Sequence, residues 1–170
     1  MVTNDDVFLV EPDIAHEKAY MSAMDRWEAS GDRVQPGLLG RDGADYAQIL
    51  KWCADYKVRP EMFSTNVTCT LFFLVNHAGE VLGGMVINHA DTKRGHLHAG
   101  IVPWRRGEGL GTRMLALALD KCREMGMEYV HIVPYKDNAG AAGTIRKNGG
   151  ILADEFFDNG KWSQRYRIAL

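Results

Sequence analysis

Hydrophobic patterns along the chain predict a mixed α/β protein of the α+β type, in which helices flank a mostly antiparallel central sheet. Apolar and β-branched runs at 68–75, 81–89 and 96–102 follow one another with short turns between them, as the strands of an antiparallel meander do. Segments with apolar residues at helical spacing precede and follow this meander. With 170 residues, of which 46% are hydrophobic, the chain 1–170 is expected to form a single domain.

The first third of the chain predicts one strand and two helices. Residues 7–10 are a short apolar run typical of a strand, and Pro12 suits the first turn of a helix. The apolar side of this helix is expected to hold Ile14, Met21, Met24 and Trp27. A polar, glycine-rich loop at 31–43 leads to a second helix, which we expect to be capped near Asp42. Its apolar positions are Tyr46, Ile49, Leu50, Cys53 and Tyr56.

The rest of the chain predicts strands and helices that do not alternate regularly. Within 81–89, Gly83 and Gly84 indicate a bulge or a close backbone contact. An apolar helix follows the meander and is expected to end at Gly126. The remaining predicted elements are a strand at 129–133, a helix at 138–147 and a hairpin of 151–157 and 162–168. This order excludes the regular β–α alternation of a doubly wound fold.

Charge and glycine are unevenly distributed. The net charge of −2 gives no sign of non-specific nucleic-acid binding. Residues 1–66 contain 7 Lys/Arg against 12 Asp/Glu, whereas residues 67–170 contain 13 against 10. The basic second part also holds 14 of the 18 glycines. This distribution points either to an anionic ligand there or to random variation of surface residues.

Cysteine spacing and hydropathy predict a protein of the cytoplasm. Cys53, Cys69 and Cys122 are far apart and lack CxxC spacing, which fits reduced thiols and neither a disulfide framework nor a zinc site. The N-terminus lacks the basic and apolar run of a signal peptide, and no apolar stretch approaches the ~18 residues of a membrane span. We therefore expect no membrane partner.

The glycine-rich turn at 103–112 is the most informative segment. It lacks the lysine of a Walker A loop, and Thr112 or Met114 stands where a dinucleotide fingerprint needs its third glycine. Alternating glycines at the start of a helix let successive N–H groups point at an anion, as in a pyrophosphate site. Arg105 and Arg106 lie beside them to neutralise its charge. The alternative is a flexible turn without a ligand.

Residues 106–111, Arg-Gly-Glu-Gly-Leu-Gly, resemble the Arg/Gln-x-x-Gly-x-Gly/Ala motif of the GCN5-related N-acetyltransferases, the GNAT superfamily. The motif stands after a predicted strand and before an apolar helix, as it does in that family. Asp137-Asn138 and the Ile-Arg-Lys-Asn-Gly-Gly run at 145–150 resemble the second half of the family. The resemblance covers 68–170, is closest to an uncharacterised bacterial subgroup, and extends to the first 66 residues in helix order only.

The resemblance implies an acetyl-CoA site where two parallel strands, 96–102 and 129–133, splay apart. Backbone groups near Ile101 and Val102 would pair with the pantetheine arm, and one N–H there would polarise the thioester carbonyl. Asn138 would hydrogen-bond the pantetheine, act as a helix N-cap, or do both. The implied CoA contacts are Ile101, Val102, Arg105, Arg106, Gly107, Gly109, Leu110, Gly111, Thr112 and Asn138.

The implied reaction is direct attack on the thioester by a primary amine of a small molecule or a protein, in a ternary complex. His96 and His98 share one strand face and are the candidates for the base. The family often has a tyrosine acid where this chain has Ile145, so Tyr135 and Tyr166 are the substitute acids. The His-x-His pair lacks a third ligand, so no metal is expected.

Several alternatives stay open at this point. A non-catalytic acyl-CoA-binding sensor is the second functional hypothesis, and a homodimer is left open. Acidic side chains of the first segment are either a solvated surface or an attraction for a cationic amine. These residues are Asp25, Glu28, Asp32, Asp42 and Asp45.

Overall fold

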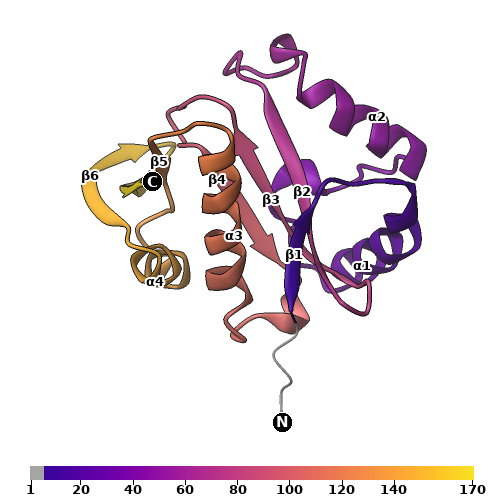
Figure 1. Ribbon diagram of the computed structural model, residues 1–170. Helices are drawn as coiled ribbons and strands as arrows, with labels where there is room; N and C mark the ends of the chain where they lie inside the picture. The colour runs from indigo at the N-terminus through magenta and orange to yellow at the C-terminus, as the bar shows by residue number, and fades with distance from the viewer. Residues whose placement is uncertain (1–5) are drawn as a thin grey trace.

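Two antiparallel sheets form the centre of the protein, which the computed structural model describes over residues 6–170 (Figure 1). The first has the order β1-β2-β3-β4 and the second the order β5-β7-β6. The strands of the first sheet are β1 (Val7–Val10), β2 (Cys69–Asn76), β3 (Val81–Asn88) and β4 (Leu97–Ile101). Those of the second are β5 (Tyr129–Ile132), β6 (Ile151–Asp158) and β7 (Lys161–Ala169).

Helices cover both faces of the first sheet (Figure 1). On one face lie α1 (Glu17–Ala29) and α2 (Tyr46–Tyr56), and on the other lies α3 (Leu110–Glu124), against which α4 (Ala139–Lys147) packs. Within residues 6–170, every helix is too short or too polar to cross a bilayer. The predicted mixed fold with a mostly antiparallel sheet is confirmed.

The first helix begins later than predicted. Asp13 caps a short 3-10 turn, Ile14–His16, so that α1 starts at Glu17 and Ile14 is 79% exposed instead of facing the core. Met24 and Trp27 are buried as expected. The second helix is capped by Asp45 and not near Asp42, because the Asp45 carboxylate accepts the N–H of Gln48.

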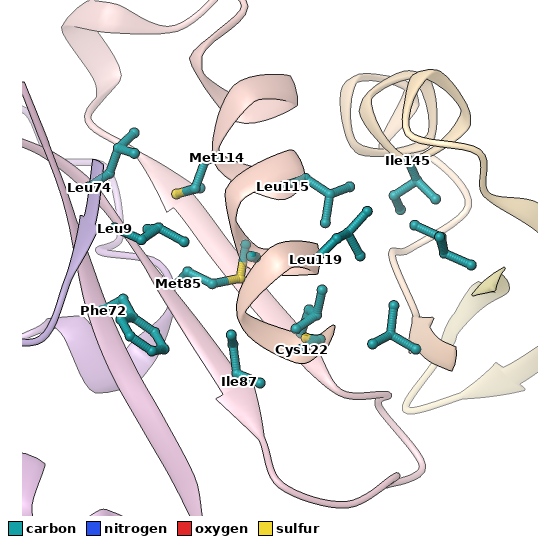
Figure 2. Packing of buried hydrophobic residues seen from close by; sticks show 14 of the residues in the cluster. Leu9, Phe72, Leu74, Met85, Ile87, Met114, Leu115, Leu119, Cys122 and Ile145 are labelled. Atoms are coloured by element: carbon teal, nitrogen blue, oxygen red, sulfur yellow. The ribbon is translucent and has the colours of Figure 1, made fainter. Parts of the chain in front are cut away.

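The central strands are apolar on both faces because helices cover both. Phe72 and Leu74 of β2 face α3, whereas Leu71 and Phe73 face α1 and α2. Figure 2 shows how α3 lies in the middle of its layer, with Met114 turned toward the sheet and Leu115 and Leu119 toward Ile145 of α4. This packing holds the start of α3 beside the end of β4.

The two sheets meet where β4 faces β5. One isolated bridge, Gly95–Ile132, joins them, and the N–H of His96 donates to the His131 carbonyl at 2.7 Å. The strands expected to splay apart, 96–102 and 129–133, are joined by this isolated bridge, whose hydrogen-bond pattern is antiparallel. Gly95 has φ +83° and lies so close to His131 that a Cβ would stand 2.4 Å from the His131 carbonyl oxygen. The backbones therefore cross at one point and do not form a ladder.

Close contacts explain Gly83 and Gly84 in β3, and the register of β2 against β3 also shifts beside Gly83, between Leu74 and Val75. A Cβ on Gly83 would stand 2.3 Å from the carbonyl oxygen of Gly100 in β4. A Cβ on Gly84 would stand 2.9 Å from the Leu39 side chain, which packs on this face between α1 and α2. The two glycines let β4 and the 31–43 loop approach β3 closely.

We expect Gly83→Ala to lower the free energy of unfolding by about 1–3 kcal/mol, because the new methyl group overlaps backbone that cannot move aside cheaply. Gly143→Ala in α4 is the matched control, since a Cβ there meets nothing within 4 Å. The control should be stabilised by about 0.5–1 kcal/mol through helix propensity. Urea denaturation of both variants checks this, and equal stability of the two would contradict it.

Candidate functional site

A cavity of about 480 Å³ separates β4 from β5. Its walls come from β4, from the chain that follows β5, and from the first turns of α3 and α4. Gln35 and Pro36, in the loop between α1 and α2, close one side. A larger hollow along α1 is shallow and contains none of the predicted catalytic or coenzyme A-binding residues. The cavity between the strands is therefore the candidate site.

The open edge of β4 supplies backbone donors to this cavity. Asn88 donates its N–H to the His96 carbonyl at 2.7 Å, and Val102 donates its N–H to the Leu82 carbonyl at 2.9 Å. Alternate residues of an antiparallel strand point their backbone groups at the partner strand, so the others point away from it. The residues of β4 whose N–H and C=O groups point toward the cavity are Leu97, Ala99 and Ile101.

The two predicted backbone contacts of the pantetheine arm, Ile101 and Val102, differ in whether they reach the cavity. Ile101 lines the cavity, but Val102 is fully buried and its N–H is already bonded to β3. Ala99, which sequence reasoning missed, takes its place at the open edge. The register of β3 against β4 decides which residues point their backbone groups at β3 and which at the cavity. It places Val102 in the first group and Ala99 in the second.

The glycine turn leads directly into the start of α3. Gly107 and Gly109 have φ +80° and +79°, a left-handed conformation that side chains disfavour. The first bond of α3 joins the Arg113 N–H to the Gly109 carbonyl at 3.2 Å. The N–H groups that precede this bond, at the positive end of the helix dipole, belong to Leu110, Gly111 and Thr112. This geometry suits an anion.

Both arginines of the turn have local partners. Arg106 donates to the Ile101 carbonyl at 3.1 Å and to the Asp32 carboxylate at 2.9 Å. Arg105 donates to Glu108 at 2.8 Å. Such ion pairs near the surface contribute little to stability, so a phosphate group can replace the carboxylates at small cost.

His98 is the histidine of the predicted pair that reaches the cavity. The Asn88 amide donates to the Gly95 carbonyl at 3.1 Å and lies 3.3 Å from His98 Nε2. Since that amide nitrogen is a donor, we assign the His98 lone pair to Nε2. Burial lowers the pKa of His98 below the ordinary 6.5, and the positive charge of Arg94 lowers it further. His98 is thus neutral at neutral pH.

His96 lies instead in the junction between the sheets. It is 5% exposed, and its Nδ1 accepts the backbone N–H of His131 at 2.9 Å. Burial also lowers its pKa. Although His96 and His98 share a strand face, the crossing of β4 over β5 covers His96 and keeps it out of the cavity.

The two predicted tyrosines are separated in the same way. Tyr135 lines the cavity and is 38% exposed. Tyr166 is fully buried; its hydroxyl donates to Gln164 at 3.1 Å and accepts from Arg146 at 2.9 Å. Ile145 lines the cavity and also packs into the core around α3.

Asn138 fits both of its predicted roles. Its Oδ1 accepts the Ala141 N–H at 3.1 Å and caps α4, and the residue also lines the cavity. The cap occupies Oδ1, which leaves the amide N–H groups for a ligand.

Most of the acidic residues of the first segment have structural partners. Asp25 and Glu28 both bind Arg41, at 2.7 and 2.6 Å, and Asp32 binds Arg106. Asp45 caps α2. None of these carboxylates lines the cavity. Across residues 6–170, no cluster of three His, Cys, Asp or Glu side chains is placed to hold a metal ion.

The cavity also contains a cation that sequence reasoning missed. Arg94, in the turn before β4, lines it and donates to Ser163 and to the Val133 carbonyl. An arginine in a polar turn carries no sequence signal of its own, and its position depends on the second sheet packing across it.

A family model identifies the chain. The model of the acetyltransferase (GNAT) family matches residues 43–149, more than half of the sequence and all of the glycine turn. The protein therefore belongs to the GNAT acetyltransferase family, as the resemblance predicted. Among curated proteins, no sequence matches this chain.

Solved structures of the same fold extend over nearly the whole chain. The microcin C7 self-immunity acetyltransferase MccE, solved with acetyl-CoA and AMP, has a TM-score of 0.67 at 11% identity and covers 98% of this chain and 94% of its own. A GNAT-family acetyltransferase from Streptococcus pneumoniae has a TM-score of 0.63 at 15% identity, with 97% and 100% covered. The spermidine/spermine N-acetyltransferase SpeG from Vibrio cholerae has a TM-score of 0.63 at 13% identity, with 96% and 93% covered. At these identities the likeness shows the fold alone.

The lowered pKa of His98 gives a pH dependence of stability. The unfolded chain binds a proton at His98 near pH 6.5, whereas the folded chain does so only at lower pH, so acid favours unfolding. We expect the free energy of unfolding to fall between about pH 7 and about pH 5.5, and to fall less in His98→Gln. Urea denaturation at both pH values measures this. The same pH-dependent loss in the variant would refute the assignment to His98.

Proposed function

We propose that the protein is an N-acetyltransferase that moves the acetyl group of acetyl-CoA to a primary amine by direct attack in a ternary complex. The observation that carries the proposal is one continuous cavity that joins the open edge of β4, the start of α3 and the neutral His98. That this chain belongs to an acetyltransferase family supports it. The MccE structure, which holds acetyl-CoA, has the same fold.

The residues of the cavity and of the glycine turn beside it offer contacts that coenzyme A could use. The N–H groups of Leu110, Gly111 and Thr112 would receive the pyrophosphate, while Arg105 and Arg106 exchange their carboxylate partners for it. The open backbone of Ala99 and the N–H of Ile101 would pair with the amide groups of the pantetheine arm, since the Ile101 carbonyl already accepts from Arg106. The Asn138 amide would donate to the same arm from the opposite wall.

The chemical step needs a base and a donor for developing charge. The amine nitrogen forms a bond to the carbonyl carbon, the carbon–sulfur bond breaks with its electron pair going to sulfur, and one amine proton ends on the thiol. An N–H of the β4 edge would stabilise the oxygen that becomes negative. His98 Nε2 would take the proton, since its 3.3 Å contact with Asn88 is long and easily exchanged.

Tyr135 is the candidate that would return a proton to the departing thiolate, because it lines the cavity where Tyr166 does not. The second candidate function is a non-catalytic acyl-CoA sensor. The observation in its favour is Ile145, which puts an apolar wall where many family members have a tyrosine.

Gly109→Val tests the pyrophosphate site. Valine cannot hold φ +79° without strain, so the turn must move and we expect acetyl-CoA to bind at least about tenfold more weakly. Gly126→Val is the matched control, since Gly126 has φ +80° at the other end of α3. Calorimetric titration of both variants gives the affinities. An unchanged affinity in Gly109→Val would remove the turn from the site.

His98→Gln tests the base. With a panel of amines and a thiol-release assay, we expect kcat to fall by about 10²–10⁴ while acetyl-CoA binds as before. His77→Gln, on an exposed turn outside the cavity, is the control. Tight acetyl-CoA binding by the unaltered protein with no turnover of any amine would favour the sensor.

A further inference from the structure

We infer that the acetyl acceptor is a small amine that carries a carboxylate, as an amino acid does, and that Arg94 binds the carboxylate. The inference rests on the proposed function, which it narrows to one class of substrate. Nothing in the family match or in the similar folds assigns an acceptor to this chain.

Arg94 is held rigidly in the cavity wall. Its guanidinium spans from the turn before β4 to the second sheet, where Nη1 donates to Ser163 Oγ at 2.7 Å and Nη2 donates to the Val133 carbonyl at 2.8 Å. The Tyr135 ring lies against it, 4.8 Å from Cζ to the ring centroid. Ser163 is fully buried, so water does not compete for its hydrogen bond with Arg94. The guanidinium is therefore positioned before a ligand arrives.

The charge of Arg94 lacks a counterion within residues 6–170. Ser163 and Val133 are neutral acceptors, and they use two of the five N–H donors of the side chain. None of the described residues that line the cavity is Asp or Glu. A partly buried cation without an anion is costly, and a ligand carboxylate would remove that cost.

Three lysines lie near this end of the cavity, and two of them are paired with carboxylates. Lys93 binds Asp158 at 3.1 Å and Lys136 binds Glu155 at 2.9 Å. Lys161 has no such carboxylate in the described part of the chain, and its Nζ lies 4.8 Å from the centroid of the Tyr135 ring, the ring that Arg94 also contacts. Two uncompensated cations thus flank Tyr135.

Arg94 and His98 line the same cavity. An acceptor whose amine lies at His98 and whose carboxylate lies at Arg94 carries both groups in one molecule small enough for that cavity. A polyamine would bring a second ammonium against Arg94 and Lys161, which like charges disfavour.

The experiment compares each amino acid with its own carboxamide, which keeps the shape and removes the negative charge. With the unaltered protein and acetyl-CoA, we expect kcat/KM for one or more amino acids to exceed that of the matching amide by roughly 10- to 100-fold at equal concentrations of unprotonated amine. Arg94→Gln should remove this preference by raising KM for the amino acid, and Arg94→Lys should restore part of it. The KM for acetyl-CoA should stay unchanged in both.

Ser163→Ala separates carboxylate binding from a merely structural contact between the sheets. It removes one hydrogen bond of Arg94 and keeps the charge, so the preference for the amino acid should persist. Equal use of acids and amides, or a preference for spermidine or a lysine peptide, would overturn the inference and leave the acetyltransferase standing. Turnover of no amine, with acetyl-CoA still bound, would instead overturn the proposed function.

Discussion

The crossing of β4 and β5 is the contact on which the site depends. His96 donates its backbone N–H to the His131 carbonyl, and His131 returns its N–H to the His96 ring nitrogen, so the two residues are joined by reciprocal bonds. Asp91 accepts a hydrogen bond from the His131 ring at 2.7 Å and so also fixes the side chain of His131. Only a glycine fits at 95, where the backbones nearly touch. Because the sheets meet at one point, the remaining lengths of the strands diverge around a cavity.

Because β4 and β5 diverge, N–H and C=O groups of β4 have no neighbouring strand on this side. A ligand with amide groups can form hydrogen bonds with them. Ala99 and Ile101 direct their backbone groups into the gap, and α3 begins at its far end. The apolar packing of α3 between the first sheet and α4 keeps that helix start in place (Figure 2). Arg94 makes the second connection across the gap and brings a positive charge to it. One geometric arrangement thus supplies an extended arm site, an anion site and a charged pocket.

Local patterns predicted most of the elements. The turn Asp158-Asn159-Gly160, the end of α3 at Gly126 and the cap at Asn138 all stand as expected, because each depends on a few consecutive residues. The predicted starts of the first two helices were wrong. Ile14 follows a helical pattern but lies in a separate 3-10 turn, and the second helix is capped by Asp45, because nearby side-chain caps decide where a helix begins.

For the site, the sequence by itself determined the glycine turn and its place between a strand and a helix, since left-handed glycines at a helix start leave a local mark. The sequence also predicted five further site residues: His98, Tyr135, His96, Tyr166 and Val102. Only the tertiary structure shows that the first two line the cavity and that the other three are buried elsewhere. Register and the crossing at Gly95 bring His98 and Ala99 to the cavity and bury His96 and Val102, and packing of the second sheet brings Arg94 into the wall. Contacts between distant segments decide exposure, and no short pattern records them.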